Sequence, residues 1–198
     1  MRPTEMRATE RQRGTVQQLR RLQVVWPGNA MIGGMTVAEA RQTFRQLHRP
    51  GEPLVMPNAW DAGSARLLAA LGAAAIATTS SGFAATLGRP DGGVNADEAI
   101  DHVEALVAAS PVPVSADLED CFHAEPAGVA DTIRRAVDAG SAGGSVEDFT
   151  RADGGSIYEL GLATERVAAA VEAAAGTGFV LTARAENLIR GVDDLADT

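Results

Sequence analysis

Short apolar runs alternate with longer amphipathic stretches along the chain from about residue 50 onward. The short runs are bounded by polar residues and predict buried β-strands, whereas the alanine-rich stretches with apolar positions three or four apart predict α-helices. The expected strands cover residues 53–57, 73–78, 112–116, 143–146 and 179–183. The expected helices cover residues 38–47, 62–71, 96–109, 127–139 and 164–175.

Alternation of strands and helices predicts an α/β fold with a parallel sheet, because each helix returns the chain to the start of the next strand. About five βα units are visible, and a complete (β/α)₈ TIM barrel needs about 250 residues. The pattern therefore leaves two architectures open. One is an open doubly wound sheet, and the other is a TIM barrel with only about its first five βα units.

The charge distribution divides the chain into two parts. Residues 1–34 contain six arginines and two glutamates, whereas residues 35–198 contain 11 arginines and 24 acidic residues. A body this acidic argues against a nucleic-acid-binding face. Thr36 and Glu39 form a capping-box pattern that predicts the start of the first helix. We expect a disordered basic extension over 1–34, with a targeting or nucleic-acid-binding arm as the other interpretation, and a partial barrel over 35–198.

Composition excludes several classes of protein. With 45% hydrophobic and 22% charged residues the chain is typical of a globular protein. No apolar run reaches the roughly 18–20 residues that span a membrane, and no export signal is evident, so we expect a cytoplasmic protein. The single cysteine, Cys121, excludes an internal disulfide framework. The absence of lysine excludes Schiff-base chemistry on lysine and a P-loop of the GK[ST] type.

Charged residues follow successive expected strands, and the carboxyl ends of parallel strands meet at one edge of a sheet. Asp117 and Glu119 follow the third strand, Glu147 the fourth and Arg184 the fifth. Neighbouring carboxylates repel one another unless a cation lies between them, and an oxygen-only ligand set favours Mg²⁺ or Mn²⁺. An adjacent arginine suits a small substrate with two or three negative charges. Helix capping is the alternative role for such acids, and we prefer it for Asp61 and Asp97.

Five strand-end motifs resemble those of the isocitrate lyase/phosphoenolpyruvate mutase superfamily, in order and with compatible spacing, from about Phe44 to the last residue. The motifs are Thr79-Ser-Ser-Gly82, Leu87-Gly-x-Pro-Asp91, Asp117-x-Glu119, Val146-Glu147-Asp148 and Thr182-Ala-Arg184. The nearest branch is that of oxaloacetate decarboxylase and carboxyphosphonoenolpyruvate phosphonomutase. The resemblance implies a (β/α)₈ barrel, a Mg²⁺ cofactor with Mn²⁺ as a substitute, and a small carboxylate or phosphonate substrate. It implies a homo-oligomer for full-length members, and no nucleic-acid or membrane partner.

The resemblance also assigns roles to individual residues. The metal ligands would be Asp117, Glu119 and Glu147, with Asp91 near the ion. The catalytic residues would be Arg184 and Asp91. The substrate would be bound by Arg184 and by backbone donors at Ser80, Ser81 and Gly82.

Three departures from the family pattern affect the expected fold and chemistry. Lyases of the family carry a Lys-Lys-Cys-Gly-His loop after the fourth strand, but residues 148–156 contain no lysine, cysteine or histidine. Cys121 and His123 occupy the position of a common Gly-Tyr-Gly stretch, and a nucleophile–base pair is one interpretation of them. The third departure is length, because strands six to eight are not evident. A truncated gene product, a fragment completed by a partner chain and a stable open sheet are the three interpretations.

Three functions follow from this reasoning. The leading hypothesis is a Mg²⁺-dependent C–C bond lyase that acts on a small 2-oxo or 2-hydroxy di- or tricarboxylate through an enolate. The closest alternative is phosphonomutase-type P–C bond chemistry on a phosphoenolpyruvate-like substrate. The third hypothesis is a non-catalytic, truncated barrel that binds a carboxylate or a partner chain.

Overall fold

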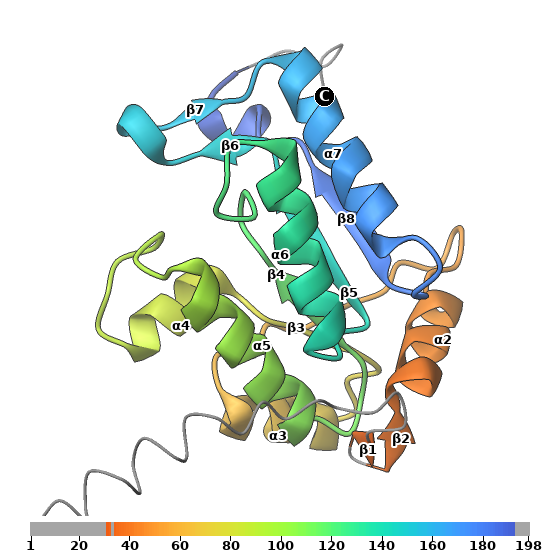
Figure 1. Ribbon diagram of the computed structural model, residues 1–198. Coiled ribbons are helices and arrows are strands. Elements are labelled where there is room, and N and C mark those ends of the chain that lie inside the picture. Colours follow the sequence, from red (N-terminus) through yellow and green to blue (C-terminus); the bar gives the residue numbers. More distant parts are fainter. Residues whose placement is uncertain (1–30, 33, 193–198) are drawn as a thin grey trace, which may run out of the picture.

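The computed structural model describes residues 31–32 and 34–192 of the protein (Figure 1). The expected basic extension therefore lies outside the described residues, apart from its last few positions. There, the short strand β1 (Met31–Ile32) pairs antiparallel with β2 (Met35–Thr36). The predicted capping box is confirmed, because the Thr36 hydroxyl accepts a hydrogen bond from the Glu39 amide and the Glu39 carboxylate accepts one from the Thr36 amide.

The described strands β3, β4, β5 and β8 form one parallel sheet in that order. Their bounds are β3 (Ile76–Ala77), β4 (Val114–Asp117), β5 (Gly143–Glu147) and β8 (Val180–Arg184). Each strand lies beside the next one in the chain, whereas a doubly wound sheet reverses its strand order part-way. The topology is therefore that of a partial TIM barrel and not of a doubly wound sheet.

The prediction of a first strand over 53–57 is wrong. Instead, an isolated parallel bridge joins Asn58 to Ala77 at the free edge of β3, and the Ala59 amide donates to the Ala77 carbonyl over 2.8 Å. Proline explains the difference, because Pro53 and Pro57 have no amide hydrogen to give to a ladder. The position of the first strand in a barrel is thus occupied by an extended segment with a single pairing point.

The helices connect the strands and cover one face of the sheet. Their bounds are α2 (Val37–Leu47), α3 (Ala62–Ala70), α4 (Ser80–Thr86), α5 (Ala96–Ala109), α6 (Pro126–Asp138) and α7 (Leu160–Ala174). Figure 1 shows α6 and α7 side by side in front of the sheet, with α5 next to α6. The short helix α4 was not expected from the sequence, since residues 78–82 look like a polar loop. None of the described helices is long and apolar enough to cross a membrane.

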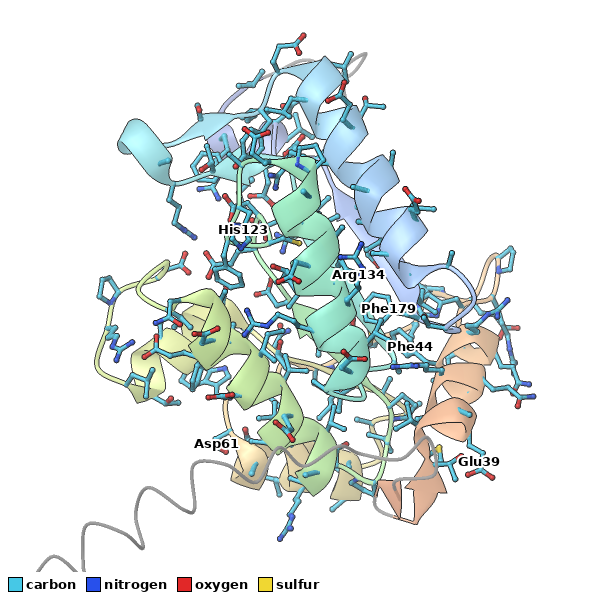
Figure 2. All side chains as sticks on the ribbon, in the orientation of Figure 1. Glu39, Phe44, Asp61, His123, Arg134 and Phe179 are labelled. Carbon is cyan, nitrogen blue, oxygen red and sulfur yellow. The ribbon has the colours of Figure 1, made fainter. Side chains whose placement is uncertain are left out.

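The core lies between these helices and the sheet. Its buried members come from most of the helices and strands around the sheet, and they include Leu106, Val114, Leu118, Ile133 and Val146. A second cluster centres on Phe44 of α2, whereas Phe179, just before β8, belongs to the first (Figure 2). With the amino ends of the strands packed in this way, the polar strand ends gather at the opposite edge of the sheet.

At that opposite edge, two small elements flank the strand ends. Strands β6 (Phe149–Thr150) and β7 (Ser156–Ile157) form an antiparallel hairpin around the 3₁₀ turn η1 (Ala152–Gly154). Figure 1 shows this hairpin and α4 projecting on the same side of the molecule. A second 3₁₀ turn, η2 (Leu188–Arg190), follows β8.

Candidate active site

Asp117, the last residue of β4, is held in one orientation by the neighbouring strand end. Its amide donates to the Thr78 hydroxyl over 2.8 Å, and its Oδ2 accepts from both the amide and the hydroxyl of Ser80, over 2.8 and 2.9 Å. Its Oδ1 is buried without a hydrogen-bond donor among the described residues. A carboxylate whose Oδ2 is fixed by two hydrogen bonds, and whose Oδ1 accepts none, is suited to bind a cation or a proton donor.

Glu119 lies on a loop whose backbone is strained. Glu119, Cys121 and Phe122 have φ values of +50°, +59° and +61°, a region that side-chain-bearing residues seldom occupy. The buried guanidinium of Arg166 on α7 holds the loop by donating to the backbone carbonyls of Asp120, His123 and Ala124. The loop thereby directs the Glu119 carboxylate inward, and Glu119 Oε1 is buried without a donor in the described structure.

Glu147 and Arg184 face each other across the β5–β8 pair, where they are register partners. Glu147 Oε1 lies 2.5 Å from Arg184 Nη1, which is also 3.8 Å from Asp117 Oδ1. Burial raises the pKa of Glu147 to about 7, against the lowering effect of Arg184, and the charges of Glu186, Asp117 and Glu119 raise it further. The Glu147 carboxyl can therefore exchange a proton near neutral pH.

A second arginine lies on the other side of the carboxylates. Arg151, between β6 and η1, places Nη2 2.6 Å from Asp91 Oδ2 and Nε 3.3 Å from Glu119 Oε2. Gly92 makes this possible, because a Cβ at that position would overlap the Arg151 side chain. Arg151 thus links the loop after α4 to the hairpin and to the end of β4.

The charges of these six side chains are consistent with a divalent cation. The four carboxylates outnumber the two arginines by two charges, and two buried carboxylate oxygens lack donors. Burial, the largest cause, raises the pKa of Glu119, as do the neighbouring charges of Asp117 and Asp91, although Arg151 opposes them. Among the described residues no three His, Cys, Asp or Glu side chains form a ready-made metal cage. Mg²⁺ fits this arrangement, because it commonly binds one or two carboxylates and keeps several waters.

The residues expected to bind substrate lie beside this cluster. Ser80, Ser81 and Gly82 form the first turn of α4, and Thr79 is its N-cap. Two of the three expected backbone donors are already engaged, since the Ser80 amide donates to Asp117 and the Gly82 amide to the Thr79 hydroxyl over 3.3 Å. Arg184 is directed at the carboxylates, whereas Asp91 lies at the outer edge with Arg151.

The interpretation of Cys121 and His123 as a nucleophile and base is wrong. The Cys121 side chain is fully buried, and burial raises the pKa of its thiol to about 12. A thiol of this kind does not form the thiolate that attacks a substrate at neutral pH. His123 lies at the amino end of α6 (Figure 2), packed against Gly128. Asp61, in contrast, caps α3 as expected, with its carboxylate accepting from the Ser64 amide over 2.7 Å.

A cavity of about 460 Å³ opens beside the cluster. It is bounded by the loop after α4, the strained loop after β4 and the β6–β7 hairpin. Its lining includes Glu119, Glu147, Arg151, Phe149 and Tyr158. A volume of this size accommodates a small organic acid with room for bound water.

The family assignment rests on a match over most of the chain. A model of the phosphoenolpyruvate phosphomutase family matches residues 44–198, which include every residue of the site. The chain belongs to this family. The sequence-based resemblance to the isocitrate lyase/phosphoenolpyruvate mutase superfamily is thereby confirmed.

Related proteins place the chain within this family of lyases and mutases. A Burkholderia cenocepacia J2315 protein classed as a lyase/mutase is 51% identical, with a TM-score of 0.76 over 81% of this chain and 59% of its own. Oxaloacetate acetylhydrolase, in complex with 3,3-difluorooxaloacetate, is 26% identical, with a TM-score of 0.69 over 76% of this chain and 55% of its own. An uncharacterized protein of Mycobacterium tuberculosis H37Rv is 40% identical over 98 residues, half of this chain and 38% of its own length. The chain spans less than two thirds of each of these relatives.

Sequence reasoning identifies the carboxylates of this phosphomutase-family site but misses two of its arginines. Arg151 lies in the 148–156 segment, which attracts attention only for the lysine, cysteine and histidine that it lacks. Arg166 lies in the middle of α7, where an arginine ordinarily faces solvent. No sequence signal reveals that Arg166 is buried, but an arginine four residues after Glu147 is a usable signal for Arg151.

Proposed function

We propose that the protein is a Mg²⁺-dependent C–C bond lyase acting on a small 2-oxo or 2-hydroxy di- or tricarboxylate. The observation that carries this proposal is the set of strand-end carboxylates. Asp117 and Glu147 contact the Arg184 guanidinium, and one buried oxygen each of Asp117 and Glu119 accepts no hydrogen bond. This arrangement offers a cation site and an anion site within reach of one small molecule.

Asp117 would hold the ion most directly, since its Oδ1 accepts no hydrogen bond and its Oδ2 is fixed by Ser80. Glu119 and Glu147 would complete the site, in part through water, and Asp91 would lie near its outer edge. When bound, Mg²⁺ would offset the negative charge that develops on the 2-oxo oxygen as the C–C bond breaks. Membership of the phosphoenolpyruvate phosphomutase family supports this assignment.

Arg184 would bind the substrate carboxylate next to the reacting carbons. Its guanidinium presents paired donors that match a carboxylate, and Glu186 holds it by accepting from Nη2 over 2.8 Å. Glu186 in turn accepts a hydrogen bond from Arg190 over 3.0 Å, so Arg190 helps to hold Glu186, and through it Arg184, in place. For a 2-oxo dicarboxylate, heterolysis of the C–C bond to the distal carboxylate would release CO₂ and leave the electron pair on the fragment bound at Arg184, as an enolate that a proton then quenches. For a 2-hydroxy acid, the hydroxyl would lose its proton and become the carbonyl of the fragment at Arg184, and the electron pair would leave with the other fragment as the enolate.

The test is Mg²⁺-dependent release of 2-oxo acids from a panel of 2-oxo and 2-hydroxy dicarboxylates. Asp117→Asn and Arg184→Gln should each lower kcat/KM on the order of 100-fold or more. Arg135→Gln removes an arginine from an ion pair with Asp97 on the helix surface and is the matched control. Lack of turnover by folded wild-type protein on every substrate would falsify the lyase assignment.

The phosphonomutase alternative is decided by the same protein preparation. Conversion of phosphonopyruvate to phosphoenolpyruvate, followed by ³¹P NMR, would assign P–C bond chemistry to the site. Binding of carboxylates without turnover on either panel would assign the protein to the non-catalytic hypothesis. A cytoplasmic location and an oligomeric state stay expectations from the sequence.

A further inference from the structure

Two arginines flank the Asp117–Glu119 pair from opposite sides. Arg184, at the end of β8, contacts the Asp117 side of the pair, and Arg151, on the hairpin, contacts the Glu119 side. Only Arg184 is assigned to substrate by the proposed function. The second guanidinium is an equally strong anion-binding group, and it lines the 460 Å³ cavity together with Glu119 and Glu147.

The environment of Arg151 differs from that of a structural arginine. Arg166 is 1% exposed and donates to three backbone carbonyls, so its charge is fully committed to the fold. The Arg151 side chain is 40% exposed, and its partners are two site carboxylates, Asp91 and Glu119. A divalent cation at the carboxylate cluster would take over the neutralisation of these charges, which frees the guanidinium for another anion.

We infer that Arg151 binds the distal carboxylate of a 2-oxo dicarboxylate whose inner carboxylate binds at Arg184. The inference rests on the proposed function and deepens it, because it names the substrate class as a dianion with separated carboxylates. The 460 Å³ cavity provides space beside Arg151, with Glu119 and Glu147 in its wall, and Glu147 in turn contacts Arg184. Arg151 is thus the specificity-determining residue that separates dicarboxylates from shorter acids.

A purely structural role for Arg151 predicts a different behaviour. If the guanidinium only ties the Asp91 loop to the hairpin, its loss disturbs the whole site, and every ligand and the metal bind more weakly. If it binds the distal carboxylate, its loss weakens ligands that possess this group and spares those that lack it. The two roles therefore separate in a comparison of ligands.

The experiment is calorimetric titration of the full 198-residue chain in the presence of Mg²⁺. One probe is 3,3-difluorooxaloacetate, a dicarboxylate that oxaloacetate acetylhydrolase binds, and the other is oxalate, which lacks the distal arm. Arg151→Gln should weaken the first about 10- to 100-fold, the range of a lost charged hydrogen-bond pair. It should change the affinity for oxalate and for Mg²⁺ less than about threefold, below 1 kcal/mol.

Two further variants sharpen the result. Arg151→Lys keeps the charge and should recover part of the lost affinity for the dicarboxylate, without restoring the paired geometry. Arg135→Gln, which breaks an ion pair of a similarly exposed arginine on α6, should leave both probes unchanged.

Several outcomes would overturn the inference. Equal weakening of both probes by Arg151→Gln would reduce Arg151 to a structural tie, and unchanged affinity for the dicarboxylate would remove it from binding altogether. Wild-type protein that binds neither probe would overturn the proposed function together with this inference. Wild-type protein that binds both probes, with no difference between them in the variant, would overturn the inference alone.

Discussion

The neighbouring strands β5 and β8 are alike in length and pairing but differ in their surroundings. Both have five residues and pair in parallel over their whole length. β5 lies between two strands and is buried except at Ser145, whereas β8 has one strand neighbour in the described structure and its last three residues are exposed. Each ends in a site residue, Glu147 or Arg184.

This difference shows how the surroundings of a strand affect the pKa and the exposure of the charged side chain at its end. The buried end of β5 raises the pKa of Glu147 to about 7, since burial outweighs the effect of Arg184 at 2.5 Å. Arg184, at the end of β8, keeps 41% of its side chain exposed in the described structure. The end of β5 therefore supplies a buried carboxylate, and the end of β8 supplies a partly exposed guanidinium that a ligand can contact.

The largest expected effect is on the packing of the interior strand. A Cβ at Gly143 would lie 2.5 Å from the Val180 carbonyl oxygen and 2.6 Å from Phe44 Cε1. Gly143→Val should therefore lower the free energy of unfolding by about 3 kcal/mol. Ala183→Val, at an exposed position of β8, should change it by less than about 0.5 kcal/mol. Urea denaturation measures both, and equal losses would contradict the contrast between the strands.

A smaller effect on the free energy of unfolding is expected when a cation binds at the strand ends. Mg²⁺ at 100 times its dissociation constant should stabilise the fold by about 2.7 kcal/mol. Thermal unfolding in a MgCl₂ series measures this, with NaCl at equal ionic strength as the control. Asp117→Asn should abolish the Mg²⁺-dependent rise in Tm, because it removes the unpaired charged oxygen. A rise that persists in this variant would place the ion elsewhere.

The raised pKa of Glu147 predicts a pH dependence of stability. Between pH 4.5 and 7 the folded state binds more protons at this carboxyl than the unfolded state, so stability falls as the pH rises through this range. Without Mg²⁺, Glu147→Gln should remove about 1–2 kcal/mol of this loss. Unfolding at pH 5 and pH 8 measures the effect. Parallel pH profiles of variant and wild type would show that Glu147 is ionised throughout.

The smallest effect is expected at His102, away from the strand ends. It stacks on Phe83 with ring centroids 3.8 Å apart, and burial lowers its pKa to about 4, against the effect of Asp61. The unfolded state then binds more protons between pH 6.5 and 4, so stability falls as the pH drops. His102→Gln should reduce this pH-dependent loss of stability by about 1 kcal/mol. A slope opposite in sign to that of Glu147 separates the two groups in one pH series.

Local pattern predicted most of the scaffold. The helix starts at Thr36 and Asp61 were found because a cap is a contact between residues three apart in the chain. The strands that became β4, β5 and β8 were found to within two residues at their ends, because buried parallel strands are short apolar runs. The segment 53–57 was not, since an apolar run does not reveal whether its backbone donors are paired.

The candidate site likewise contains residues that the sequence predicted and residues that it did not. Asp117, Glu119, Glu147 and Arg184 were expected together because strand order alone brings the ends of parallel strands to one edge. Their roles stay predictions. The contacts of Arg151 with Asp91 and Glu119 join residues 60 and 32 positions apart, and they depend on how two loops fold over that edge.

The sequence by itself determined the α/β alternation, the helix caps and the residues at the strand ends, because each depends on neighbours in the chain or on the period of the pattern. Only the tertiary structure decided that the strands follow barrel order, that Cys121 is inert and that Glu147 has a pKa near 7. The burial of a side chain and the charges around it depend on residues that are distant in sequence. Both are therefore defined only when the chain has folded.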